Sequence, residues 1–170
     1  MSPRRLSLLL LALALLPGCG YHLAGVGGGL PPSLKTVSIP PFRNQTSRAQ
    51  VDVIFTAAIR DELVRRSKLK LIEKVDEADA HLDGEIVACD VRPISTSDQL
   101  VGSLYEVRVT LNLRLIDRVH GELLFEGTNL TYTDTYPTDE SSFYALETQT
   151  LERIAKKAAS SAVATMVEAF

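Results

Sequence analysis

The strongest constraint on the fold is a strict alternation of apolar and polar residues between Tyr105 and Leu115. Tyr105 and every second residue after it are apolar, and the residues between them are Glu106, Arg108, Thr110, Asn112 and Arg114. Successive side chains of a β-strand point to opposite faces, so this segment predicts a strand with one buried and one wet face. An antiparallel sheet that is covered on one side only has this pattern.

Two other stretches have the spacing of amphipathic helices. Apolar side chains recur at intervals of three and four in residues 51–65, which predicts a helix with Thr46 or Ser47 as its N-cap. Asp139 and Glu140 place negative charge where a second helix would start, as the helix dipole favours. The expected apolar face of that second helix consists of Phe143, Leu146, Leu151, Ile154, Ala155, Ala158, Ala162 and Met166.

Four further segments have the character of strands: 35–40, 69–74, 80–91 and 122–132. The order strand, helix, strand at the start predicts a parallel crossover, and the later strands should form hairpins. Each helix and the Tyr105 strand have a single apolar face that must be buried against another element. The simplest solution is an α+β fold, a two-layer sandwich with two helices packed on one face of a mixed four- to five-stranded sheet.

Basic residues gather at the C-terminal end of the first predicted helix, namely Arg65, Arg66, Lys68 and Lys70. Cations at this position interact favourably with the helix dipole, which is the simpler explanation of the cluster. The alternative is a binding patch for an anionic partner.

The N-terminus has the character of an export signal. Arg4 and Arg5 precede Leu6 to Leu16, a run that contains only Leu, Ser and Ala. This run is too short to cross about 30 Å of hydrocarbon as a permanent helix, and its length is typical of the apolar region of a signal peptide. The alternative is an ordinary secretory signal that has a cysteine near its end by chance.

The residues that follow, Leu16-Pro17-Gly18-Cys19, resemble the lipobox of bacterial lipoproteins. The resemblance implies cleavage before Cys19 and attachment of fatty acyl chains such as palmitate, which together anchor a protein stably to a membrane. Gly20, rather than Asp, follows the cysteine, which by the usual sorting rule implies the outer membrane. We therefore expect a signal peptide at 1–18, a lipidated glycine-rich tether at 19–34 and a single α/β domain at 35–170.

Composition excludes several classes of function. The first 18 residues hold two of the 18 basic residues and none of the 21 acidic ones, so the remainder has a net charge of −5. This balance disfavours nucleic acid as a partner. Lipidation would use Cys19, which leaves Cys89 without a partner for an intramolecular disulfide. Cys89 has apolar neighbours in a strand-like segment, so we expect a buried, inert thiol.

Catalytic signatures are missing from the sequence. It has no His-Glu-x-x-His, Cys-x-x-Cys or Gly-x-Ser-x-Gly segment. His81, Asp83 and Glu85 share one face of a predicted strand and suggest a metal site, but same-face neighbours lie about 6.6 Å apart along a strand. A solvated polar face is the simpler interpretation. We expect no enzyme activity, no catalytic residues, no cofactor and no metal.

A family resemblance emerges at the lipidation site. Cys19-Gly20-Tyr21-His22-Leu23 is similar to the start of mature lipopolysaccharide-assembly lipoproteins, the LptE family. The resemblance extends over most of the mature chain. It includes Leu30-Pro31, the segments 35–40 and 42–46, Glu77-Ala-Asp-Ala80 with Gly84, Tyr105 at the start of the alternating strand, and the alanine-rich final helix.

Membership of this family would imply a two-layer α/β domain that plugs the large outer-membrane barrel LptD. Together the two proteins assemble lipopolysaccharide at the cell surface, and the lipoprotein also helps the barrel to assemble. The lumen of such a barrel is polar, so the wet face of the Tyr105 strand suits contact with it. The same face would equally suit water.

The resemblance also implies direct binding of lipopolysaccharide through basic residues in loops at one end of the sheet. Arg92 is the candidate, because it lies at the base of the 92–104 connection and arginine binds phosphate in bidentate fashion. Two observations depart from the family pattern. Asp98 lies in the same connection, and residues 134–150 contain no Lys or Arg. The alternative role of Arg92 is an ion pair with a nearby acid.

The main alternative function is that of a periplasmic lipoprotein module in another envelope machine. Activators of peptidoglycan synthases and curli-secretion-like proteins have similar strand–helix openings. A lipid-anchored hydrolase is a third class, but no nucleophile and base could be identified for it.

Overall fold

The computed structural model describes residues 30–31, 33–95, 103–138 and 143–168. The expected signal peptide, Cys19, most of the expected tether and the charged pair Asp139–Glu140 lie outside these residues. The elements run in the order β1 (Thr36–Ser38), β2 (Arg43–Asn44), α2 (Val51–Arg66), β3 (Lys70–Ile72), the 3₁₀ turn η1 (Val75–Glu77), β4 (Ala80–Ser95), β5 (Ser103–Asp117), β6 (Leu123–Thr138) and α3 (Phe143–Glu168).

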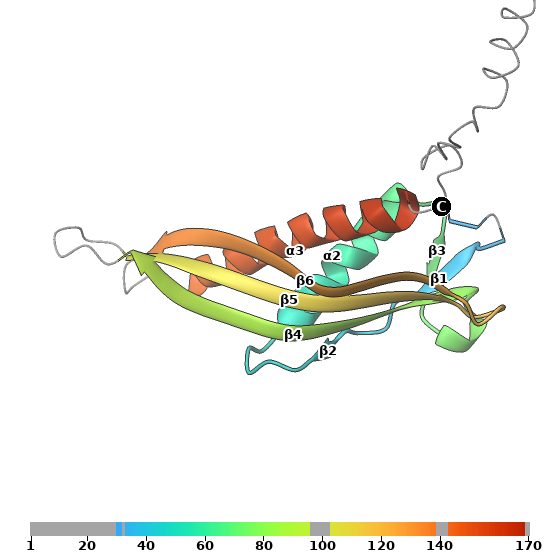
Figure 1. Cartoon of the computed structure of the whole chain (residues 1–170), viewed down its shortest axis with the longest axis horizontal. Coiled ribbons are helices and arrows are strands. Elements are labelled where there is room, and N and C mark those ends of the chain that lie inside the picture. The colour runs from blue at the N-terminus through green and yellow to red at the C-terminus, as the bar shows by residue number, and fades with distance from the viewer. Residues whose placement is uncertain (1–29, 32, 96–102, 139–142, 169–170) are drawn as a thin grey trace, which may run out of the picture.

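The strands form one mixed sheet of six strands (Figure 1), in the order β3-β1-β4-β5-β6, with β2 also paired to β4. β1 pairs in parallel with both β3 and β4, whereas β4, β5 and β6 pair antiparallel. The expected parallel crossover through the first helix and the later hairpins are therefore confirmed. The sheet exceeds the expected strand number because β2, only two residues long, adds to it.

Both helices pack on the same face of this sheet, α3 along β5 and β6 and α2 beside it (Figure 1). The predicted buried face of β5 is confirmed, since the side chains of Val107, Val109, Leu111, Leu113 and Leu115 are fully buried beneath the helices. The α+β sandwich with two helices on one face is thus the observed fold. Neither described helix is long and apolar enough to span a membrane.

β4 and β6 are longer than their sequence patterns indicated. Pro93 breaks the pattern of β4, but β1 and β2 pair with this strand only as far as Ile86, so Pro93 lies on a free edge where no amide donor is needed.

In β6, Asp134 occupies a position on the helix side. Its carboxylate lies 3.0 Å from Arg153 Nε and 3.2 Å from Lys157 Nζ of α3, and these ion pairs allow a charge at this position.

The predicted N-cap of the first helix is wrong. α2 begins at Val51, its N-cap is Gln50 with φ 66°, and Gln50 makes no side-chain capping hydrogen bond. The hydroxyl of Thr46 instead accepts a hydrogen bond from Arg48 N at 3.1 Å, and Thr46 N donates to Asn44 Oδ1 at 2.9 Å. The polar residues before the helix satisfy one another, so the loop continues for four residues beyond the expected start.

Asp79, in the Glu77-Ala-Asp-Ala80 segment, joins the start of β1 to the start of β4. Its Oδ2 accepts hydrogen bonds from Lys35 N at 2.8 Å, Thr36 N at 2.9 Å and Thr36 Oγ1 at 2.9 Å. The backbone donors of Lys35 and Thr36 lower the pKa of Asp79 below its usual value. Ala78 and Ala80 on either side are buried. This part of the family resemblance therefore reflects a structural junction.

The turn between β5 and β6 holds an ion pair that should depend on pH. Asp117 Oδ1 accepts from Val119 N at 2.8 Å and His120 N at 3.0 Å, and its Oδ2 lies 2.8 Å from His120 Nδ1. The hydrogen bond and charge of Asp117 raise the pKa of His120 above 6.5, and the hydrogen bond from His120 lowers the pKa of Asp117 below 3.8.

We expect the stabilisation by protonated His120 to be complete below pH 6.5 and to be lost as the pH rises through its elevated pKa. An NMR titration should show a His120 pKa above 6.5 that returns toward this value in an Asp117→Asn variant. Asparagine keeps the acceptor for the two amides and replaces the charged oxygen that faces His120 Nδ1 with an amide nitrogen. An unchanged pKa in this variant would contradict the proposed pairing.

Candidate functional site

The face of β4, β5 and β6 that carries no helix, here called the open face, is the candidate site. It presents the polar residues that the alternation of β5 predicted, namely Glu106, Arg108, Thr110, Asn112 and Arg114. Their neighbours across the sheet are also polar. Thr110 and Thr131 hydroxyl oxygens lie 3.1 Å apart, and Asn112 Oδ1 accepts a hydrogen bond from Asn129 N at 2.7 Å. The open face is therefore a polar surface with internal hydrogen bonds.

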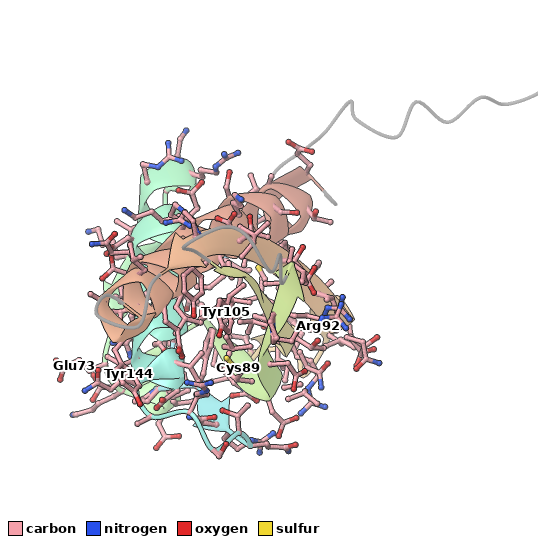
Figure 2. All side chains as sticks on the ribbon, turned by 90° about the vertical axis from the view of Figure 1, so that its left-hand side faces the viewer. Glu73, Cys89, Arg92, Tyr105 and Tyr144 are labelled. Carbon is pink, nitrogen blue, oxygen red and sulfur yellow. The ribbon has the colours of Figure 1, made fainter. Side chains whose placement is uncertain are left out.

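Arg92 belongs to the open face and is paired with an acid. Its Nε and Nη2 lie 3.0 and 2.8 Å from Glu106 Oε1, and Arg108 Nη2 approaches the same oxygen at 3.1 Å. Figure 2 shows Arg92 pointing outward, whereas Cys89 and Tyr105 lie toward the interior. Two guanidinium groups thus share one carboxylate beside a hollow that is also bordered by Asp90. The ion-pair alternative for Arg92 is observed.

A second hollow of about 200 Å³ lies farther along the open face, between β2 and β6. Arg43 Nε lies 3.3 Å from Glu85 Oε1, and Gln45 Nε2 donates to the same oxygen at 2.7 Å. Asn112 and Arg114 also line this hollow. Its lining carries both signs of charge, which favours contact with a polar surface over an isolated ion of one sign.

The proposed metal ligands do not converge. His81 Nε2 lies 3.6 Å from Asp83 Oδ2, whereas Glu85 is engaged by Arg43 and Gln45. In the described ranges, no three His, Cys, Asp or Glu side chains are grouped closely enough to hold a metal ion. His81, Asp83 and Glu85 lie on one partly exposed polar face of β4.

Cys89 lies on the helix side of β4, opposite Val109 of β5. Burial raises the pKa of its thiol to about 11. At neutral pH the thiol is therefore protonated and a poor nucleophile. Cys89 is half-buried rather than buried as expected, and its protonated thiol agrees with the low reactivity predicted from the sequence.

Sequence reasoning missed the contribution of Arg43. The segment around it is not among the predicted strands, but Arg43 pairs with Glu85 in the register of β2 and β4. A strand of two residues is too short for periodicity to reveal it. The position of Cys19 lies outside the described residues, so its predicted lipidation is not tested here.

Comparisons with known proteins agree with this architecture. The family model of LptE, described as lipopolysaccharide-assembly, matches residues 34–166. The crystal structure of a lipoprotein candidate from Caulobacter crescentus CB15 aligns with a TM-score of 0.52 at 16% identity, over 75% of this chain and 88% of that one. The solution structure of lipoprotein B from Nitrosomonas europaea aligns with a TM-score of 0.52 at 18% identity, over 81% of this chain and 84% of that one.

At these identities the two structures support the fold alone, and the family model supplies the assignment. Its match covers every described strand, α2 and all but the last two residues of α3, and therefore includes the open face. The chain belongs to the lipopolysaccharide-assembly family LptE.

Proposed function

We propose that this chain is a non-enzymatic outer-membrane lipoprotein that works with the barrel LptD to assemble lipopolysaccharide at the cell surface. In this proposal residues 1–18 are removed, Cys19 carries the lipid anchor, and residues 35–170 form the domain on the periplasmic side or inside the barrel lumen. The family assignment supports the general role. The observation that carries the partnership is the open face, a broad sheet surface that neither described helix covers and whose central stretch, from Glu106 to Arg114 of β5, is polar.

The charges on the open face are paired in a way that suits contact with a polar barrel wall. Glu106 already pairs with Arg92 and Arg108, and Glu85 pairs with Arg43, so none of these groups would be buried without an ionic partner. Arg114 is different, because no ion pair in the described part of the chain includes it. It is exposed and can form a new pair with the partner.

The test is to isolate the tagged full-length protein from outer membranes of its own host in mild detergent. We expect LptD to co-purify at about one-to-one stoichiometry and to resist salt. Arg114→Glu should reduce recovery of the barrel roughly tenfold, because a reversed charge at a complementary contact weakens binding by at least about 1.4 kcal/mol. Lys156→Glu is the matched control, since Lys156 is equally exposed but lies on α3, away from the open face.

Equal recovery with both variants would remove the open face from the interface. Recovery of a peptidoglycan synthase or a curli-type secretion protein, with no LptD, would contradict the proposal. The alternative role, a periplasmic lipoprotein module of another envelope machine, would then be the better description.

Direct binding of lipopolysaccharide is the second part of the proposal. Arg92 and Arg108 share one carboxylate, so the pair has one positive charge beyond that of Glu106 for a phosphate of the glycolipid. Asp90 reduces this excess, which predicts weak binding. Arg92→Ala should lower affinity for purified lipopolysaccharide about tenfold, as measured by fluorescence with labelled glycolipid.

Arg43→Ala is the control for this measurement, because Arg43 also pairs with one carboxylate but lies at the other hollow. If Arg92→Ala retained full affinity, Arg92 would not belong to a glycolipid site.

A further inference from the structure

We infer that the end of the domain where the chain enters β1 forms a basic surface that rests on anionic lipid headgroups. The surface, here called the basic end, comprises Lys35, Lys68 and Lys70. The inference rests on the proposed lipidation of Cys19, which would place this membrane nearby.

Strand pairing brings the three lysines together from two parts of the sequence. β1 and β3 are parallel, with Thr36 opposite Lys70, and Lys70 N donates to Lys35 O at 2.8 Å. α2 ends at Arg66, so Lys68 lies in the short connection that leads from the helix into β3. All three lysine side chains are exposed.

The basic residues at 65–70 fall into two groups, because the arginines form ion pairs and the lysines do not in the described part of the chain. Arg65 and Arg66 both bond to Glu62, and the hydrogen bond from Arg65 is the main cause that lowers the pKa of Glu62. By contrast, the ion pairs among the described residues include neither Lys68 nor Lys70. The two arginines are therefore held in ion pairs within the helix, where Glu62 offsets one of their two charges, whereas Lys68 and Lys70 keep their full charge for an outside partner.

Lys35 is likewise absent from the ion pairs among the described residues. Its charge lowers the pKa of Asp79 slightly, but the hydrogen bonds to that carboxylate come from backbone amides and the Thr36 hydroxyl rather than from the lysine ammonium group. The ammonium group is thus available, and Lys35 extends the basic end toward the N-terminal segment.

Exposed apolar side chains flank these lysines. Val64 is 47% exposed one turn before Lys68, and Leu71, which points to the face of β3 opposite Lys70, is 40% exposed at the edge of the sheet. Lysines beside exposed aliphatic groups are typical of surfaces that lie at a lipid interface, where the apolar part contacts acyl chains and the ammonium groups contact headgroups. Free phosphate would use the charges but not the apolar side chains, so a lipid surface fits the combination better.

The position at which the chain enters the domain determines which end of the domain would face the membrane. In Figure 1 the first described residues, which lead into β1, lie at the same end of the sheet as β3 and the last turns of α3. About eleven residues separate Leu30 from Cys19, and even a fully extended segment of this length spans at most about 40 Å. The net charge of the chain is negative, so an anionic surface would repel much of the domain. The basic end is the part that such a surface would attract.

The experiment uses the lipidated full-length protein, reconstituted into vesicles of phosphatidylcholine alone or mixed with phosphatidylglycerol. Lysines are acetylated under limiting conditions and quantified by peptide mass spectrometry. We expect Lys35, Lys68 and Lys70 to react several-fold more slowly on the anionic vesicles at low salt, and to recover at high salt, because contact with headgroups is screened over about 10 Å. Lys156, on the exposed side of α3, is the internal control and should react equally on both vesicles.

A charge reversal sharpens the test. Lys70→Glu should restore the reactivity of Lys35 and Lys68 on anionic vesicles, and the matched Lys156→Glu should not. Equal reactivity on both vesicles would overturn the inference, as would slow reactivity on both, since that contact would not depend on anionic lipid. Protein that fails to float with either vesicle would show that the lipid anchor is absent and would overturn the proposed attachment as well.

Discussion

Replacement of Arg48 with alanine is expected to lower the free energy of unfolding by about 3 kcal/mol, because a buried carboxylate would lose its counter-ion. Arg48 Nη1 lies 2.5 Å from Glu147 Oε1, and the Glu147 side chain is only 7% exposed. Its Oε2 is buried without a hydrogen-bond partner among the described residues. The Arg48 side chain is 35% exposed, so water can partly replace it, and the expected loss lies at the low end for a buried pair.

The measurement is denaturant unfolding followed by circular dichroism, for single and double variants. Glu147→Gln should cost less than Arg48→Ala, because it leaves an exposed arginine rather than a buried acid. The double variant Arg48→Met/Glu147→Leu should recover much of the loss, since apolar groups can fill the same space. A change below about 0.5 kcal/mol for Arg48→Ala, the size typical of surface substitutions, would show that the pair contributes little.

This ion pair also shows where prediction from sequence reaches its limit. Arg48 and Glu147 are 99 residues apart, and neither belongs to a periodic pattern that marks it as a partner. The pair joins the N-terminal end of α3 to the loop before α2, while Arg66 and Ser160 meet nearer the opposite ends of the two helices. The helices are therefore parallel neighbours, a relation that the apolar stripe of each helix does not specify.

The features that the sequence predicted correctly are those that depend on side-chain periodicity. The alternation from Tyr105 predicted which face of β5 is buried, and the helical stripe predicted that Leu151, Ile154 and Ala158 face the core. These patterns are strong because many residues repeat the same signal. Single interactions lack this redundancy. The loop at Asn44 displaced the expected helix start, because its polar side chains bond to one another rather than cap the helix.

The candidate site was predictable to the same extent. The polar side of β5 followed directly from the alternation, and so did its exposure on a sheet covered on one face. The pairing of Arg92 with Glu106 did not, because it depends on the register of β4 against β5, where Arg92 is opposite Glu106. Register follows from the bulges of β4 and the hairpin geometry, which a single sequence does not reveal.

Two residues of the family resemblance, Asp79 and Gly84, have structural roles that explain their positions. Asp79 joins two strands through backbone hydrogen bonds, and Gly84 lies beneath the ring of Phe42. These residues define the framework on which the open face is built. A substitution at either position would therefore affect the proposed function through the fold rather than through contact with a partner.

Gly84→Ala is expected to destabilise the domain by about 2–3 kcal/mol, because overpacking of a filled core forces side chains and backbone to shift. A Cβ atom at Gly84 would lie 2.3 Å from Phe42 Cδ1 and 2.4 Å from Cε1. Phe42 is itself only 3% exposed, so its ring has little room to move. Displacement of the ring would also loosen β2, which follows Phe42 directly and carries Arg43 to the open face. Denaturant unfolding measures the loss of stability, and LptD recovery measures its effect on the proposed complex.

Gly127→Ala is the matched control in β6, which is separated from β4 by β5. There the Cβ atom would meet Leu130 Cδ1 at 2.7 Å, the far end of a flexible side chain that can rotate away, so the cost should be below about 1 kcal/mol. Phe42→Leu should destabilise the native protein but should cost less in the Gly84→Ala background, because the smaller side chain makes room for the added methyl group. If instead the effects of Phe42→Leu and Gly84→Ala were additive, the ring contact would not be the reason that glycine occupies position 84.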